Sequence, residues 1–195
     1  MKTIRCIPFI AILTLSLSCS KEETTNKAED AGLSKKEMIA RGQYLVAMAG
    51  CNDCHSPKSF GATGPVPDST RILSGHPSDM PIGPVRQEEL SSWVLFNHHS
   101  TAAVGPWGIS FAANLTPDET GIGNWTFEQF SKAMREGKYK GLEGTRPLLP
   151  PMPWPNYIGV SEEDMQAIFA FLKSLKPVKN IVPNYIPAEE IAGTR

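Results

Sequence analysis

The stretch Cys51-Asn52-Asp53-Cys54-His55 decides how this 195-residue chain folds. Its C-x-x-C-H spacing is that of a c-type haem attachment site, because two thiols three positions apart can bond to the two vinyl groups of one porphyrin. The neighbouring imidazole then lies beside one face of the ring, where it can bind the iron. We therefore predict one covalently attached haem c, with Cys51 and Cys54 forming the thioethers and His55 as the proximal iron ligand.

Two cysteines at this spacing can also form a disulfide or half of a zinc site. A tetrahedral zinc site needs further ligands, and the chain has no second C-x-x-C and no H-x-H cluster to supply them. The remaining cysteines, Cys6 and Cys19, belong to the N-terminal segment, and neither is expected to pair with the motif. Haem attachment is the interpretation that the spacing favours.

The N-terminal segment resembles a bacterial lipoprotein signal. Two basic residues precede an apolar stretch at 7–17, which is too short to span a bilayer comfortably, and small residues followed by Cys19 come next. The match is imperfect, since Ser16 stands where Leu usually precedes the lipidated cysteine. We expect residues 1–18 to be a signal peptide and Cys19 to carry the lipid; an ordinary signal peptide cleaved nearby is the alternative.

Residues 19–33 are polar and lack any period, as a flexible tether between a lipid and a folded domain would be. We expect the protein to be exported from a bacterial cell and to lie in the periplasm or at the outer membrane. Its net charge is −1, or about −3 once Lys2 and Arg5 leave with the signal. This balance argues against a nucleic-acid partner and permits docking with a redox protein that presents a basic patch.

Three segments carry the signals of helices. Ser34-Lys35-Lys36-Glu37 and Thr126-Phe127-Glu128-Gln129 are capping boxes, and they open helices that we expect to run to about Ala49 and to Gly137. Ser161 precedes three acidic residues and a third helix, which Pro177 ends. The residues expected on the apolar faces are Met38, Tyr44, Leu45 and Met48 in the first helix, Phe127, Phe130 and Met134 in the second, and Met165, Ile168, Phe169, Leu172 and Leu175 in the third.

Residues 56–124 are rich in Gly and Pro and show weak helix or strand signals only at 88–97. A loop region of this length inside a domain is uncommon unless it is functional or wraps something. We expect this region to wrap the haem.

The iron needs a second axial ligand or keeps an open site, and this choice determines what the protein does. Met152 is the predicted distal ligand, because the prolines of Pro150-Pro151-Met152-Pro153-Trp154-Pro155 stiffen the loop that would hold its sulfur. Met80, in Asp79-Met80-Pro81, is the rival. The other methionines of the folded region lie on predicted helix faces, where packing in the core is the expected role.

Three further histidines are weaker candidates. His98 and His99 could supply a second histidine ligand, and His76 follows a glycine. Loop histidines more often face solvent or hydrogen-bond to the backbone. Met/His ligation would also raise the reduction potential above that of a bis-His haem, which suits an acceptor of electrons from a dehydrogenase.

The order of these features resembles a class I c-type cytochrome domain over residues 38–178. The resemblance implies an all-α cytochrome c fold, in which the N- and C-terminal helices cross and helices and long loops wrap round one covalently bound haem. In that family a glycine of one crossing helix packs against an aromatic residue of the other. Gly42 is therefore expected to meet Phe169 or Phe171.

Four segments make the resemblance more specific: Asn-Leu-Thr-Pro-Asp at 114–118, Thr-Gly-Ile-Gly-Asn-Trp at 120–125, Ala-Met-Arg-Glu-Gly at 133–137 and Met-Pro-Trp at 152–154. They are similar to the cytochrome subunits of membrane-associated alcohol and gluconate-type dehydrogenases, in which the Met before Pro is the distal ligand. Those subunits usually carry three haem domains, whereas this chain has a single C-x-x-C-H, and residues 72–107 look like an insertion. We expect a domain at 34–178 that contains this insertion, followed by an extended tail at 179–195.

Asn114, Thr116 and Trp125 are candidate contacts to the haem propionates, or they shape a turn; both alternatives stay open. The predicted function is that of an electron-transfer protein, not an enzyme, which passes electrons between redox partners such as a dehydrogenase or an oxidase. The alternative is a haem enzyme or gas sensor, peroxidase-like, with an open or labile sixth iron position and His76 or His98 as its distal acid–base group.

Overall fold

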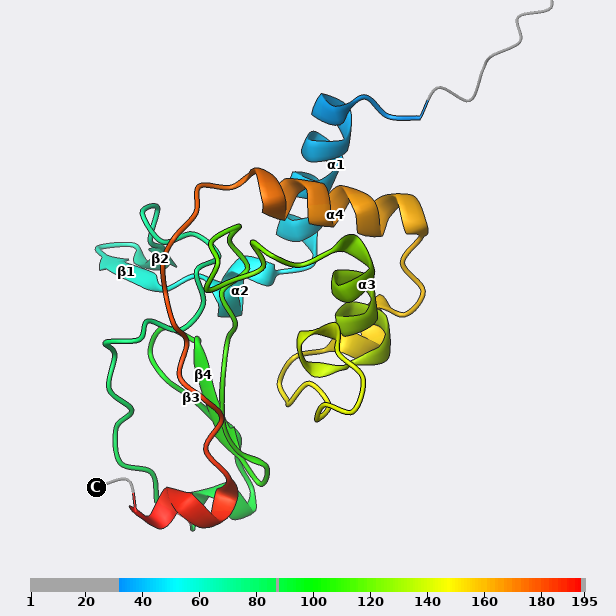
Figure 1. The fold of residues 1–195 in the computed structure, drawn as a ribbon. Coiled ribbons are helices and arrows are strands. Elements are labelled where there is room, and N and C mark those ends of the chain that lie inside the picture. Colours follow the sequence, from blue (N-terminus) through cyan, green and yellow to red (C-terminus); the bar gives the residue numbers. More distant parts are fainter. Residues whose placement is uncertain (1–31, 87, 194–195) are drawn as a thin grey trace, which may run out of the picture. The chain divides into compact units, whose positions relative to one another are not determined.

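The computed structural model describes residues 32–86 and 88–193; the predicted signal peptide, Cys19 and most of the predicted tether lie outside the described residues. The helices are α1 (Lys35–Met48), α2 (Cys51–His55), α3 (Phe127–Glu136) and α4 (Glu162–Ser174) (Figure 1). Four short 3-10 helices accompany them: η1 (Glu89–Ser91), η2 (Tyr139–Gly141), η3 (Trp154–Tyr157) and η4 (Ala188–Gly193). The strands are β1 (Lys58–Gly61), β2 (Gly64–Pro67), β3 (Leu95–Phe96), β4 (Ala102–Gly105) and β5 (Gly108–Phe111). Within residues 32–86 and 88–193, no helix is long and apolar enough to cross a membrane.

Side-chain caps begin the three long helices, as predicted. The Ser34 hydroxyl accepts the Glu37 N–H, and the Glu37 carboxylate accepts the Ser34 N–H at 2.9 Å, so both halves of the capping box form. Thr126 opens the same kind of box ahead of α3, and Ser161 accepts the Asp164 N–H at the start of α4. Each such cap stabilises a helix by about 1 kcal/mol, which is why local sequence is enough to place these helices.

Helices α1 and α4 cross at Gly42 (Figure 1). A Cβ at Gly42 would collide with the Ala167 carbonyl and would lie 2.7 Å from the Cβ of Phe171. Only a glycine permits this approach, and the close packing offsets the cost of about 1 kcal/mol that glycine carries inside a helix. The predicted contact between Gly42 and an aromatic residue of the last helix is confirmed, with Phe171 as the partner.

The buried face of α1 differs in part from the predicted one, since Leu45 packs against the buried core as predicted but Tyr44 and Met48 do not. Gly42 and Val46 are the buried residues of this helix, whereas Tyr44 is 55% and Met48 is 68% exposed. The helix has few apolar residues, so their positions in the sequence predict only part of the buried face. Close approach at Gly42 decides the orientation instead, and Val46, one turn further on, follows Gly42 into the core.

Two small sheets occupy the region that was expected to be loops, so the all-α prediction needs correction. Strands β1 and β2 form an antiparallel hairpin, and β3, β4 and β5 form an antiparallel sheet with β4 in the centre. Strand β3 has only two residues, and all four residues of β4 are buried. Neither strand therefore shows the alternation that identifies a strand exposed on one face.

The folded part contains two separate hydrophobic cores. The main core lies among the helices; its buried members are Val46, Leu73, Ile122, Phe130, Met165, Ile168 and Leu172. The second core lies between the β3–β4–β5 sheet and the C-terminal segment, and its buried members are Val104, Ile109 and Ile191. Met165 is completely buried and Met134 packs against the main core, which confirms their predicted packing role.

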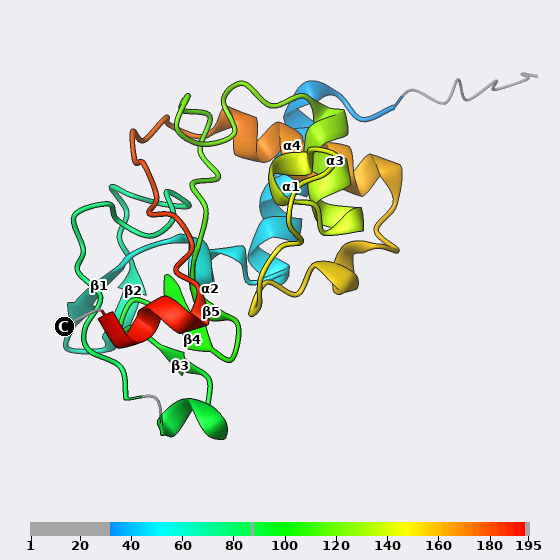
Figure 2. The same ribbon diagram turned by 60° about the horizontal axis from the view of Figure 1, so that its bottom comes forward.

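The segment after α4 joins the second core. Within it, Ile186 pairs with Ile109 of β5 through backbone hydrogen bonds of 2.8 and 3.1 Å. It then turns into η4 beside the sheet (Figure 2), where Ile191 is buried. The C-terminal residues are thus part of the sheet's packing, and not only a surface tail.

Candidate haem site

Helix α2 presents the two cysteines of the motif on one side. Cys51 and Cys54 are three residues apart, so their side chains are neighbours on the helix surface. Gly50, at φ 66°, lets the chain turn from α1 into this short helix. Neither cysteine forms a disulfide, and burial raises the pKa of the Cys51 thiol to about 11 and also raises that of Cys54. Both thiols therefore keep their protons at neutral pH.

Among residues 32–86 and 88–193, one ring nitrogen of His55 has a hydrogen-bond partner and the other has none. Its Nδ1 lies 2.8 Å from the Ala113 carbonyl oxygen. Because a carbonyl can only accept, Nδ1 carries the proton and Nε2 keeps its lone pair. Burial lowers the pKa of His55, which favours this neutral form. A neutral imidazole with a free Nε2 and a fixed second nitrogen is the arrangement that metal-binding histidines use, so the motif fits a haem iron.

The start of the predicted insertion holds His55, the predicted proximal ligand, in place. The Gly75 N–H donates to the His55 carbonyl at 2.7 Å, and the His76 N–H donates to the Ala112 carbonyl at 2.9 Å. Gly75 has a φ of 79°, and a Cβ there would lie 2.7 Å from the Ala113 oxygen. A glycine is therefore required at this position. In the sequence, only the Ser-Gly-His-Pro run at 74–77 pointed to this glycine.

Lys58 and Ser56 stabilise the end of α2, and sequence analysis missed both. The Lys58 ammonium donates to the carbonyls of Asn52, Asp53 and Ser56 at 3.0, 2.9 and 2.5 Å. Positive charge at a helix C-terminus is favourable, so a lysine just past the motif was the available signal. The Ser56 hydroxyl accepts the Leu73 N–H at 2.8 Å and so ties α2 to the main core.

The loop that carries Met152 is shaped by the end of α3. Gly137, at φ 65°, ends that helix, and a Cβ there would collide with the Trp154 indole. The Leu148 N–H donates to the Gly137 carbonyl at 2.6 Å, and the Met152 N–H donates to the Leu149 carbonyl at 3.2 Å. The Pro150–Pro151 peptide bond in this loop is cis. Met152 itself is half-buried.

Tyr157, five residues after Met152, brings the loop near the cysteines. Tyr157 and Cys51 both pack against the main core. Burial raises the pKa of the Tyr157 hydroxyl, and the neighbouring Cys51 and Cys54 sulfurs raise it further. The loop and the attachment motif thus share one region of the protein.

Of the competing ligand candidates, Met80, His76 and His99 have hydrogen-bond partners elsewhere. The Met80 sulfur accepts a hydrogen bond from the Asn97 amide at 3.5 Å. His76 is completely buried, with Nδ1 2.9 Å from the Thr101 hydroxyl and Nε2 3.3 Å from the Met80 carbonyl. His99 accepts the Lys58 N–H at 3.0 Å. His98 is exposed. By contrast, no hydrogen bond reaches the Met152 sulfur from the described part of the chain.

Asn114 and Thr116 are buried in a turn and bind the C-terminal segment. The Asn114 carbonyl oxygen accepts the Thr116 N–H at 2.9 Å and its hydroxyl at 2.7 Å. The Asn114 amide donates to the Val178 carbonyl at 2.8 Å, and the Thr116 hydroxyl accepts the Val178 N–H at 3.1 Å. These contacts support the turn-forming alternative for both residues. Trp125 is half-buried against the main core, and its indole N–H has no hydrogen-bond partner among residues 32–86 and 88–193.

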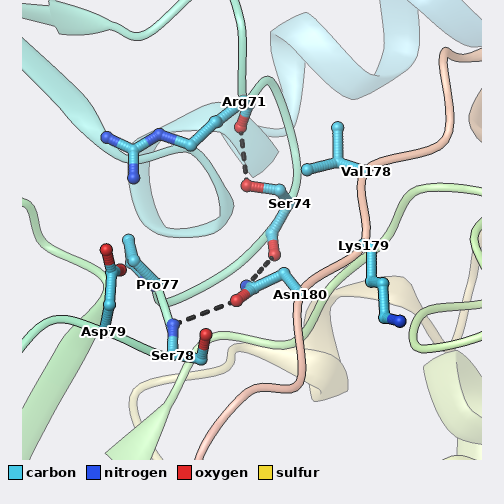
Figure 3. A pocket seen from close by; sticks show the side chains of 8 residues that line it. All are labelled: Arg71, Ser74, Pro77, Ser78, Asp79, Val178, Lys179 and Asn180. Atoms are coloured by element: carbon cyan, nitrogen blue, oxygen red, sulfur yellow. Dashed lines mark hydrogen bonds between the residues drawn. The ribbon is translucent and has the colours of Figure 1, made fainter.

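A polar hollow of about 310 Å³ lies between residues 71–79 and the C-terminal segment (Figure 3). Asn180 forms part of its wall. The Asn180 amide donates to the Ser74 and His76 carbonyls at 2.7 and 2.9 Å, and its oxygen accepts the Ser78 N–H at 3.0 Å. These bonds attach the C-terminal segment to the insertion. Neither the motif nor Met152 lines this hollow.

The described residues do not assemble a separate metal site. In the ranges 32–86 and 88–193, no group of three or more His, Cys, Asp or Glu side chains is placed to hold a metal ion. Cys51 and Cys54 therefore lack the extra ligands that a tetrahedral zinc site needs.

Comparison with known proteins agrees with this geometry. Residues 39–176 match the cytochrome c family. The gluconate 2-dehydrogenase cytochrome c subunit of Pantoea cypripedii is 29% identical over 167 residues, which are 85% of this chain and 27% of that protein. The cytochrome c subunit of alcohol dehydrogenase (quinone) from Gluconobacter oxydans is 31% identical over 153 residues, 77% of this chain and 24% of that protein. The fructose dehydrogenase cytochrome subunit of Gluconobacter japonicus is 28% identical over 182 residues, 91% of this chain and 30% of that protein.

The chain spans only about a quarter to a third of the length of these relatives. Each of them is named as the cytochrome subunit of a dehydrogenase, and the prediction of an electron-transfer protein that is not an enzyme agrees with them. The family match covers the attachment motif, the Met152 loop and the crossing helices α1 and α4. A cytochrome c domain carries covalently bound haem c. This chain belongs to the cytochrome c family.

Proposed function

We propose that the protein is a single-haem c-type cytochrome that carries electrons between redox partners through an iron bound by His55 and Met152. The observation that carries this proposal is the hydrogen bond from His55 to Ala113, which leaves Nε2 as the ligand atom beside two free thiols. Bound haem supplies an iron that alternates between the ferric and ferrous states.

The residues of this chain hold the haem and set the reduction potential of its iron. Cys51 and Cys54 bind the porphyrin through thioethers, so the haem cannot dissociate from an exported protein. The Ala113 carbonyl fixes the orientation of the His55 ring and raises its basicity as a ligand. Met152 supplies a thioether sulfur, which raises the reduction potential relative to a second histidine.

The choice of Met152 is supported by what the rival side chains do. The sulfur of Met80 accepts a hydrogen bond from Asn97, and both nitrogens of His76 are engaged. The same engagement of His76 removes it as the free distal acid–base group that the alternative, a haem enzyme or gas sensor, would need. His98, the other candidate for that role, is exposed. For the propionates we propose Trp125 as a contact, since its indole N–H is available, ahead of Asn114 and Thr116.

We further propose an exported protein whose partner is a dehydrogenase and whose second partner is an oxidase or another redox protein. The relatives, named as cytochrome subunits of gluconate, alcohol and fructose dehydrogenases, support a dehydrogenase as the donor. Lipid on Cys19 would anchor the domain at the periplasmic side or at the outer membrane through residues 19–33. Nucleic acid is not an expected partner.

Carbon monoxide binding tests the closed iron centre on which electron transfer depends. The full chain is expressed with haem attachment, reduced and exposed to carbon monoxide while the visible spectrum is followed. A protein with both axial positions filled should bind the gas slowly or not at all, and should be oxidised and reduced reversibly by one electron. Immediate, stoichiometric binding of carbon monoxide would instead support the enzyme or sensor alternative.

A further inference from the structure

The loop that carries Met152 has few backbone N–H groups that could donate hydrogen bonds to the rest of the protein. Five of its residues are prolines, at 147, 150, 151, 153 and 155, and proline has no N–H to donate. The carbonyl oxygens of the loop are therefore the groups through which the rest of the protein can fix it.

One of these carbonyls is bound by the β3–β4–β5 sheet. The Ser110 hydroxyl of β5 donates to the Pro150 carbonyl at 2.6 Å, across 40 residues of sequence. The Trp107 indole N–H donates to the Ser110 oxygen at 3.3 Å. The Ala103 carbonyl is a second acceptor for the Ser110 hydroxyl, at 3.4 Å, and the bond of 2.6 Å to Pro150 is the shorter of the two. The Trp107 carbonyl in turn accepts the Tyr185 hydroxyl at 2.7 Å.

A second contact supports the same loop from the C-terminal segment. The Arg146 guanidinium lies 4.0 Å from the centre of the Tyr139 ring and 5.6 Å from that of Tyr185. Tyr185 thus touches both the sheet, through Trp107, and the residues just before the prolines. Cation–π contacts of this kind are favourable, and they fix the start of the loop as Ser110 fixes its middle.

We propose that Ser110 is a positioning residue for the distal ligand: by binding the Pro150 carbonyl, it holds the Met152 sulfur where it can bind the iron. This inference rests on the proposed function, because it requires Met152 to be that ligand. A thioether is a weak iron ligand, so a small loss of loop support is enough to let an external ligand compete with it.

Displacement of Met152 by imidazole tests this role in the full-length, haem-loaded protein. Ser110→Ala should tighten the apparent binding of imidazole to the oxidised protein by about three- to tenfold, the range expected for the loss of one intramolecular hydrogen bond. Ser110→Thr keeps the hydroxyl and should restore most of the parent affinity. Ser91→Ala is the matched control, because the Ser91 hydroxyl also donates to a backbone carbonyl, that of Glu88 at 2.9 Å, but within its own turn and not to the Met152 loop.

The outcomes separate this inference from the proposed function. If Met152→Ala binds imidazole no better than the parent, the ligand assignment itself is wrong. If Met152→Ala binds it much better but Ser110→Ala behaves like Ser91→Ala, only the role of Ser110 is overturned. Should Ser110→Ala not accumulate as folded protein, Trp107→Phe decides: at least twofold tighter imidazole binding supports the role, and parent affinity overturns it.

Discussion

A Cβ at Gly75 would lie 2.7 Å from the carbonyl oxygen of Ala113, the same oxygen that accepts the hydrogen bond from His55. The Gly75 N–H also donates to the His55 backbone carbonyl at 2.7 Å. A residue of the predicted insertion therefore lies next to both carbonyls that involve His55, its own backbone carbonyl and the Ala113 carbonyl beside its ring. The predicted insertion thus supports His55, the predicted proximal ligand.

Gly75→Ala should lower the free energy of unfolding of the protein. Its Cβ would lie 2.5 Å from the Ala112 oxygen and 2.7 Å from the Ala113 oxygen, at a φ that side chains rarely adopt. Backbone strain and the displaced carbonyl together are expected to cost about 2–4 kcal/mol. Guanidinium unfolding followed by haem absorbance measures the change. Gly83→Ala serves as the control, since a Cβ there meets nothing within 4 Å; equal losses in the two variants would contradict this role of Gly75.

Met152→Ala should remove the distal ligand. The methionine-to-iron charge-transfer band at the red edge of the visible spectrum is expected to disappear from the oxidised protein. The reduction potential should fall by a substantial part of the range of about 0.8 V that axial ligands span. Met80→Ala should keep both the band and the potential, because the Met80 sulfur is already bonded to Asn97. The reverse pattern would assign the iron to Met80.

Acid stability should depend on Asp68. Its carboxylate accepts the Thr70 hydroxyl at 2.7 Å, the Thr70 N–H at 2.9 Å and the Arg71 Nε–H at 2.9 Å, and these bonds lower the pKa of Asp68 to about 2. In the unfolded chain an aspartate titrates near pH 4. The stability it contributes is therefore complete above about pH 4 and is lost as the pH falls toward 2.

Asp68→Asn should lower the denaturant midpoint at pH 6 and flatten its decline between pH 6 and about pH 3. Denaturant unfolding at several pH values measures both changes. Glu119→Gln, at an exposed carboxylate, is the control and should follow the parent curve. A parent-like slope in Asp68→Asn would show that the hydrogen bonds around this carboxylate do not affect acid stability.

Cys19→Ala should release the protein from the membrane, because the predicted lipid is the expected anchor. Fractionation of cells into soluble and membrane parts, followed by detergent phase partition, measures this. Cys6→Ala should leave the distribution unchanged, since Cys6 belongs to the predicted signal peptide. Cys19→Ala protein that stays in the membrane fraction would count against lipidation.

Short-range signals in the sequence identified a large part of this protein. The capping boxes at Ser34 and Thr126 place their helices because a cap depends on residues three positions apart. Gly42 and Phe171 could be matched because the family resemblance pairs a small residue with an aromatic one. The strands of the β3–β4–β5 sheet could not be identified, since they are two to four residues long and β4 is buried on both faces.

The sequence by itself determined the chemistry of the attachment motif, the helices that surround it and the family. Those properties follow from residue types at fixed, short spacings, and these spacings can be read without knowing the tertiary structure. Only the tertiary structure decided which hydrogen-bond partner each polar side chain has. Asn114 and Thr116 bind Val178, Met80 binds Asn97, and Ser110 binds Pro150. A buried polar atom takes whichever partner the packing brings near, and spacing along the chain does not record that choice.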